Sequence, residues 1–120
     1  MKVNKWKKRK GNNLKIEKKN GNVIVINNSS SEATIYATKI IKCENEHVNV
    51  DFKAKVIKGS GALMKMINRN KQCRMDIILN SEASSTEAMK GFLLPILVIK
   101  PHTTIEIENV EITITKKPEN

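Results

Sequence analysis

The chain has 120 residues, enough for one domain but too few for a catalytic domain joined to a separate binding domain. It is 39% hydrophobic and only 3% aromatic, so we expect a core of aliphatic residues and methionine. The formal net charge of +10 is concentrated in residues 1–20, which carry nine Lys or Arg and one Glu, while the remainder is nearly neutral.

The first predicted segment is a basic arm over residues 1–12, ahead of a folded domain over 13–116 and a short tail over 117–120. A block of Lys and Arg at residues 7–10 is typical of a solvated, mobile tail. Such an arm can bind nucleic acid or an anionic surface through residues 1–20, or it can be a solubilising leader. The candidate anion-binding residues are Lys5, Trp6, Lys7, Lys8, Arg9 and Lys10. Trp6 would stack on a base, enter a lipid interface or cap the folded domain.

The N-terminus also bears on where the protein resides. Its positive charge is not followed by the apolar stretch of a signal peptide, so we expect a cytoplasmic protein. The longest apolar run, residues 92–99, is too short to cross a bilayer, so we expect no transmembrane segment.

The segments that follow the arm have the pattern of β-strands. Asn20-Gly21 separates two strand-like runs at 14–16 and 23–26, which predicts a tight hairpin. Residues 33–41 are expected to form the next strand. Over 47–56, Val48, Val50 and Phe52 alternate with polar residues, which predicts a strand with one buried face.

The second half of the chain continues the same pattern. A turn at 58–61 precedes alternating strands at 62–68 and 73–77, and residues 80–88 are expected to form a polar loop. Residues 89–100 are apolar on both faces and should lie deep in the structure, with a bulge or a sheet edge at Pro95. Strands at 105–107 and 110–114 complete the domain. Eight to nine strands at this spacing predict an all-β fold, an antiparallel β-sandwich.

The residues needed for catalysis or metal binding do not occur in recognisable patterns. The two histidines, His47 and His102, have no nucleophile motif beside them. Cys43 and His47 are spaced like one half of a zinc site, but no second pair follows, and two cysteines make no disulfide framework. We therefore expect a non-enzyme without a cofactor or metal.

One group of polar side chains is predicted to share an exposed sheet face and bind a ligand. It mixes charges, one amide and one aromatic ring, which suits hydroxyl-rich or charged glycans. The group is Tyr36, Asn49, Asp51, Lys53, Lys65, Arg74 and Asp76. The alternatives are a solvated face with ion pairs across strands, or a face covered by another subunit, because it also contains Leu63 and Ile67.

Residues 47–114 resemble the closing part of a carbohydrate-binding-module jelly roll. The resemblance lies in the strand Val-Asn-Val-Asp-Phe-Lys-Ala-Lys-Val at 48–56, the turn Lys-Gly-Ser-Gly at 58–61 and the strand Ala-Leu-Met-Lys-Met at 62–66. It also lies in the ending Ile-Glu-Ile-Glu-Asn-Val-Glu-Ile-Thr at 105–113. Domains of this shape occur as accessory modules of bacterial cell-wall and capsule glycosyltransferases.

The resemblance implies a non-catalytic domain that binds a glycan or polysaccharide, or that docks onto a glycan-handling enzyme. Such modules stack sugars on exposed Trp or Tyr, and here only Tyr36 and Trp6 are candidates. Two alternatives stay open. One is a structural module that forms a homo-oligomer or packs within a larger enzyme, and the other is an anion binder that works through the basic arm.

Overall fold

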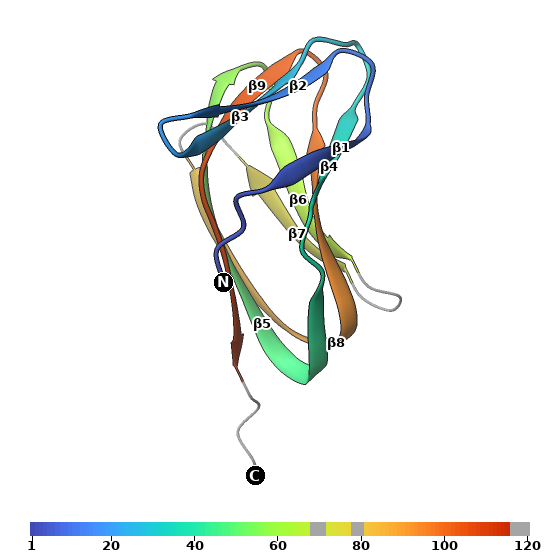
Figure 1. The fold of residues 1–120 in the computed structure, drawn as a ribbon, viewed down its shortest axis with the longest axis vertical. Helices are drawn as coiled ribbons and strands as arrows, with labels where there is room; N and C mark the ends of the chain where they lie inside the picture. Colours follow the sequence, from blue (N-terminus) through green and yellow to red (C-terminus); the bar gives the residue numbers. More distant parts are fainter. Residues whose placement is uncertain (68–71, 78–80, 116–120) are drawn as a thin grey trace.

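The computed structural model describes residues 1–67, 72–77 and 81–115, with the side chains of residues 45, 72–75, 81, 83–88 and 90 outside that description. The described residues form nine strands and no helix (Figure 1). The strands are β1 (Trp6–Lys10), β2 (Leu14–Lys19), β3 (Asn22–Asn27), β4 (Ala33–Ala37), β5 (Ile41–Lys58), β6 (Ala62–Ile67), β7 (Gln72–Ile77), β8 (Ser81–Ile99) and β9 (Thr103–Thr115). In these ranges, therefore, no helix is long and apolar enough to span a membrane.

The strands form two antiparallel sheets. Sheet A has the order β2-β3-β9-β5-β8, and sheet B has the order β1-β4-β8-β6-β7. Their inner faces share one hydrophobic core, which contains Phe52 of sheet A and Met64 of sheet B. The predicted all-β antiparallel sandwich, with its jelly-roll character, is confirmed.

Strand β8 belongs to both sheets because it bends from one to the other. Its first part pairs with β5, from Ser81 opposite Ala54 to Leu93 opposite Ile41, and its last part lies between β4 and β6. The β4 ladder ends at the pair of Tyr36 with Ile96, directly before Pro95, which has no N–H to donate. The polar loop expected at 80–88 was wrong, since residues 81–88 pair with β5.

The alternation predicted for residues 47–56 is confirmed in β5. Val48, Val50 and Phe52 are each at most 2% exposed, while Lys53 and Lys55 face solvent. Successive side chains of a strand point to opposite faces, so the apolar residues of β5 share one face and the polar residues share the other. The apolar face packs in the core and the polar face points outward. In β6, Met64 is buried and Lys65 is half-buried, which fixes the inner and outer faces of sheet B in the same way.

The predicted hairpin between β2 and β3 is also confirmed. Asn20 and Gly21 both have positive φ, at 52° and 82°, and the two strands pair from Leu14 opposite Asn27 to Lys19 opposite Asn22. Positive φ at both central residues is the geometry that favours Asn-Gly, and its twist matches that of the flanking strands.

The N-terminal residues differ from the mobile arm that the sequence suggested. Trp6–Lys10 forms β1, which pairs with β4 at the edge of sheet B (Figure 1). Before it, the N–H of Val3 donates to the carbonyl of Val110 at 2.8 Å. Trp6 is 7% exposed and packs into the core, so burial of this large ring holds β1 on the sandwich. The lysines of β1 suit an edge strand, because charge discourages pairing with other chains.

Candidate functional site

The structure divides the predicted ligand-binding group between two opposite surfaces. We call the outward-facing residues of the two sheets the outer A face and the outer B face. Asn49, Asp51 and Lys53 lie in β5 on the outer A face, and Tyr36 and Lys65 lie on the outer B face.

The remaining two members of the predicted group lie in β7. Asp76 is exposed on the outer B face. Arg74 stands opposite Lys65 in the register, and its side chain is outside the description. The group was expected to share one face, but β5 pairs with β8 and β9 whereas β7 pairs with β6, so the core separates their outer sides.

The outer A face pairs its own polar groups. Lys53 Nζ lies 3.5 Å from Glu82 Oε1 and 3.5 Å from Glu108 Oε2, and Lys55 Nζ lies 3.4 Å from Glu108 Oε1. On the same strand, the Asn49 amide donates to the Asp51 carboxylate at 2.9 Å. Ion pairing was predicted for Asp51 and Asp76 with neighbouring Lys and Arg residues, but the lysines of this face pair with Glu82 and Glu108 instead.

The outer B face has a different organisation, with two rows of side chains that cross the sheet. The first row joins Lys7, Tyr36, Ile96 and Lys65 on β1, β4, β8 and β6. The second row lies two residues along β4, β8 and β6, and three along β1, where the register shifts after Lys8. It consists of Lys10, Thr34, Val98, Leu63 and Asp76. Each row thus begins with an exposed lysine and crosses an apolar centre.

The centre of this face is unusually well covered for the outside of a sheet. Ile96 is 2% exposed although it does not belong to the core between the sheets. Its cross-strand neighbours are Tyr36 and Lys65, and both are half-buried. Side chains of the outer B face must therefore shield Ile96, and the result is a continuous surface with one aromatic ring near its middle.

The aromatic residues available for stacking differ from those expected. Trp6 lies in the core and does not stand on the surface. Phe92 is 67% exposed, opposite Lys42 at the bend of β8, and two residues before the half-buried Leu94. Sequence reasoning placed Phe92 in a buried run, because an apolar neighbourhood alone does not show which residue turns outward at a bend.

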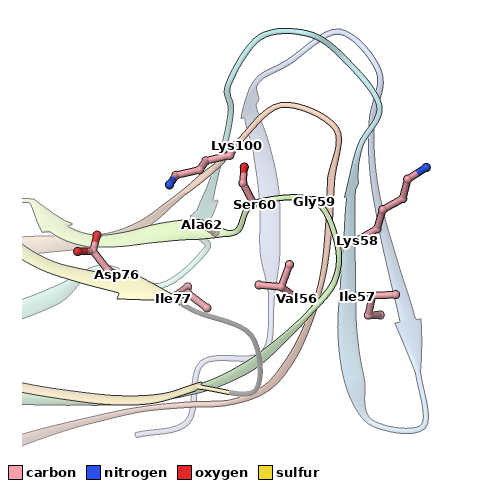
Figure 2. Close-up of a pocket in the computed structure, with 9 residues that line it drawn as sticks. All are labelled: Val56, Ile57, Lys58, Gly59, Ser60, Ala62, Asp76, Ile77 and Lys100. Atoms are coloured by element: carbon pink, nitrogen blue, oxygen red, sulfur yellow. The ribbon is translucent and has the colours of Figure 1, made fainter.

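A groove lies where the outer B face meets the turn between β5 and β6. It has a volume of about 560 Å³. Its polar lining includes Ser60, Asp76 and Lys100. Figure 2 shows these three side chains on one side of the turn, with Lys58 directed away from them. The groove therefore extends the outer B face with a hydroxyl, a carboxylate and an ammonium group.

The turn that forms one wall of this groove depends on glycine. Gly59 has a φ of 95°, and a Cβ atom added to it would lie 2.5 Å from the carbonyl oxygen of His102. Two hydrogen bonds hold the turn against the end of the sandwich. The N–H of Ser60 donates to Thr103 Oγ1 at 3.2 Å, and the N–H of Lys100 donates to the carbonyl of Gly61 at 3.1 Å.

The predicted anion-binding residues at 5–10 do not act as a separate arm. Lys7 and Lys10 are cross-strand neighbours of Tyr36 and Thr34, and Lys8 and Arg9 are exposed along the edge of β1. Lys5 and Trp6 line a pocket of about 240 Å³ between β1 and the β2–β3 hairpin. The Trp6 Nε1 atom is buried and has no hydrogen-bond partner among the described residues.

The residues considered for metal binding are not assembled by the described part of the chain. No group of three or more His, Cys, Asp or Glu residues lies in a metal-binding arrangement within it. Cys43 is a free, buried thiol, and burial raises its pKa, with a further contribution from the Glu46 carboxylate. The side chain of the second cysteine, Cys73, lies outside the described residues, and His102 sits in a turn with a φ of 51°.

Comparison with known proteins identifies the fold. No protein-family model matches the chain, and no curated protein matches its sequence. Among solved structures, it is similar to CBM86, a xylan-binding module from Roseburia intestinalis. That match has a TM-score of 0.66 and 11% identity and covers 98% of this chain and 93% of the module.

Two further structures show the same likeness. A family 61 carbohydrate-binding module in complex with β-1,4-galactotriose has a TM-score of 0.61 and 11% identity, over 91% of this chain and 88% of the module. Xylanase 10B of Clostridium thermocellum, which contains a CBM22 and a GH10 module, has a TM-score of 0.60 and 16% identity. That match covers 99% of this chain and 27% of the enzyme. The likeness establishes the sandwich fold.

Proposed function

We propose that the chain is a non-catalytic carbohydrate-binding domain and that it binds glycan on the outer B face. The observation that carries the proposal is the apolar centre of that face, where the half-buried Tyr36, Leu63 and Val98 surround the buried Ile96. A pyranose ring has an apolar side that packs well on such a surface. The likeness to carbohydrate-binding modules over nearly the whole chain supports the same function.

The polar groups around this centre suit the hydroxyl groups of a sugar. Thr34 and Lys65 lie beside the centre, and Ser60 and Asp76 line the adjoining groove. Ligand sites commonly combine an apolar floor with a few polar groups that fix the orientation of the ligand. On the outer A face, by contrast, Lys53, Lys55 and Glu108 pair with one another.

A glycan array followed by calorimetry tests this proposal. Tyr36→Ala should weaken binding of the best glycan about tenfold, since loss of an aromatic contact costs roughly 1–2 kcal/mol. Tyr36→Phe keeps the ring and should retain most of the affinity. Lys55→Ala on the outer A face is the matched control and should bind like the parent chain. Absence of binding to any glycan by the folded protein would contradict the proposal.

We further propose that the domain serves a glycan-handling enzyme. The CBM22 module of Xylanase 10B lies in one chain with a GH10 module, and this chain matches 27% of that enzyme. A binding domain without a catalytic site acts by keeping an enzyme near its polymer, because tethering raises the effective concentration of the substrate. Retention of a glycan-active enzyme on beads that carry this protein tests the association.

A second candidate function, self-association, is favoured by two exposed apolar side chains. Ile40 is 62% exposed and Phe92 is 67% exposed, and both lie near the bend of β8. Exposed apolar patches often mark protein interfaces. Light scattering after size exclusion should then show a dimer that Phe92→Ala converts to monomer. A monomer at high concentration would exclude this function.

A further inference from the structure

The basic residues of the outer B face come from strands that are far apart in the sequence. Lys7 and Lys10 stand on β1, Lys65 on β6, and Lys100 directly after β8. Lys7, Lys10 and Lys100 are exposed, and Lys65 is half-buried. The fold thus brings the positive charge of the N-terminal segment to the same surface as two lysines from the second half of the chain.

These lysines lack the protein partners that neutralise the outer A face. Every ion pair between described residues involves Lys53 or Lys55, and none involves a lysine of the outer B face. Among the described acidic residues, Asp76 lines the groove, and Glu32 directly precedes Ala33, which pairs with Ile99 at the same end of the sheet. The central and β1 parts of the outer B face are therefore positively charged without internal compensation.

The lysines also stand on both sides of the proposed sugar platform. Lys7 and Lys65 belong to one row, with Tyr36 and Ile96 between them. Neighbouring strands lie about 4.8 Å apart, so the two lysine backbones are separated by about 14 Å. A ligand lying across Tyr36 would reach both ammonium groups, because each lysine side chain can lean toward the centre.

We infer that the outer B face takes an acidic polysaccharide, with sugar rings on Tyr36 and anionic groups paired with Lys7 and Lys65. This inference rests on the proposed function. An ammonium group forms charge-assisted hydrogen bonds to carboxylate, sulfate or phosphate oxygens, and these bonds are stronger than those to neutral hydroxyls. A neutral glycan has no anionic group that could pair with these lysines. The ligand chemistry is therefore a sugar polymer that carries repeated negative charges.

Single-stranded nucleic acid fits this surface less well. Binding of a nucleic acid strand relies on several aromatic rings that stack successive bases. The outer B face has one ring near its centre, Tyr36, and the next exposed ring, Phe92, lies at the bend of β8. Trp6, which could have supplied another ring, is in the core.

The test measures binding of the full chain to four polymers by affinity electrophoresis and calorimetry. The polymers are polygalacturonate, dextran sulfate, neutral β-1,4-galactan and single-stranded DNA. The variant Lys7→Gln with Lys65→Gln removes the two charges beside Tyr36. The matched control, Lys53→Gln with Lys55→Gln, removes two charges from the outer A face. All four positions are exposed or half-buried, and circular dichroism verifies folding.

We expect polygalacturonate or dextran sulfate to bind more tightly than galactan, and the difference to shrink as salt is added. The Lys7 and Lys65 variant should lose about fivefold or more in affinity for the acidic polymer, and the control should lose less than twofold. A preference for polygalacturonate identifies the anionic group as a carboxylate, and a preference for dextran sulfate identifies it as a sulfate ester.

Three outcomes would overturn the inference. If galactan binds as tightly as the acidic polymers and the Lys7 and Lys65 variant binds like the parent chain, the ligand is not acidic. The proposed glycan-binding function would still hold. Failure of all the polysaccharides would remove the proposed function as well. Tighter binding of DNA that depends on the same lysines would assign the face to nucleic acid.

Discussion

The two outer faces of this sandwich are both rich in lysine but differ in what the lysines contact. On the outer A face, Lys53 and Lys55 share the carboxylate of Glu108, whose side chain is 18% exposed. On the outer B face, Lys7 and Lys65 flank a ring and a buried isoleucine, and no ion pair among the described residues involves them. Lysine content alone therefore does not distinguish the two faces. They differ in whether the described residues leave the lysines unpaired next to apolar area.

The largest expected effect tests whether β1 belongs to the outer B face. Trp6→Ala removes a buried ring from the core and should lower the free energy of unfolding by about 3–5 kcal/mol. Urea denaturation measures this change. Lys8→Ala, an exposed position on the same strand, should change stability by less than about 0.5 kcal/mol. If the Trp6→Ala variant is as stable as the parent chain, residues 6–10 do not pack on the sandwich. Lys7 would then not belong to the outer B face.

Two isoleucines, one on each outer face, differ in how completely they are covered. Ile96→Ala should cost about 2–4 kcal/mol, because the side chain is 2% exposed and its loss leaves a cavity. Ile24→Ala, at a half-buried position of β3 on the outer A face, should cost about 1 kcal/mol. Chemical denaturation of both variants gives the difference. Equal costs would show that the outer B face has no special covering over its centre.

Two glycines test whether the groove at the end of the outer B face is fixed in shape. Gly59→Ala should destabilise the fold by about 1–3 kcal/mol, because the new Cβ would meet the carbonyl of His102 at 2.5 Å. Gly21 also has a positive φ, but no described atom beyond its chain neighbours lies within 4 Å of an added Cβ, so Gly21→Ala should cost about 1 kcal/mol. Thermal unfolding ranks the two. The reverse order would mean that the turn moves away from the sandwich end.

The smallest expected effect concerns the ion pairs of the outer A face. Lys53→Gln with Lys55→Gln should lower stability by less than about 1 kcal/mol, since exposed ion pairs contribute little. Raising the salt concentration should reduce this difference further. Denaturation at low and high salt measures both effects. A loss of several kcal/mol would mean that the Glu108 network holds the sheet together.

Parts of the architecture could be predicted from the sequence because they depend on neighbouring residues. The alternation over residues 48–56 determines which side chains of β5 are buried, since successive residues of a strand point to opposite faces. Asn20-Gly21 determines the hairpin, because both residues tolerate the positive φ that the turn requires. Together with the spacing of the eight to nine strand-like runs, these patterns predict an antiparallel sandwich.

Which residues share a surface depends on the order of the strands in the two sheets. Tyr36 and Asp51 have the same local pattern of outward polar residues, but strand order places them on opposite sides of the core. Residues 81–88 read as a loop, and they form a strand because β5 offers its backbone hydrogen bonds along that edge. Trp6 is buried in the core and Phe92 is exposed, and in both cases the position depends on how distant strands pack together. Pairing between distant segments follows from packing of the whole chain, and local periodicity does not encode it.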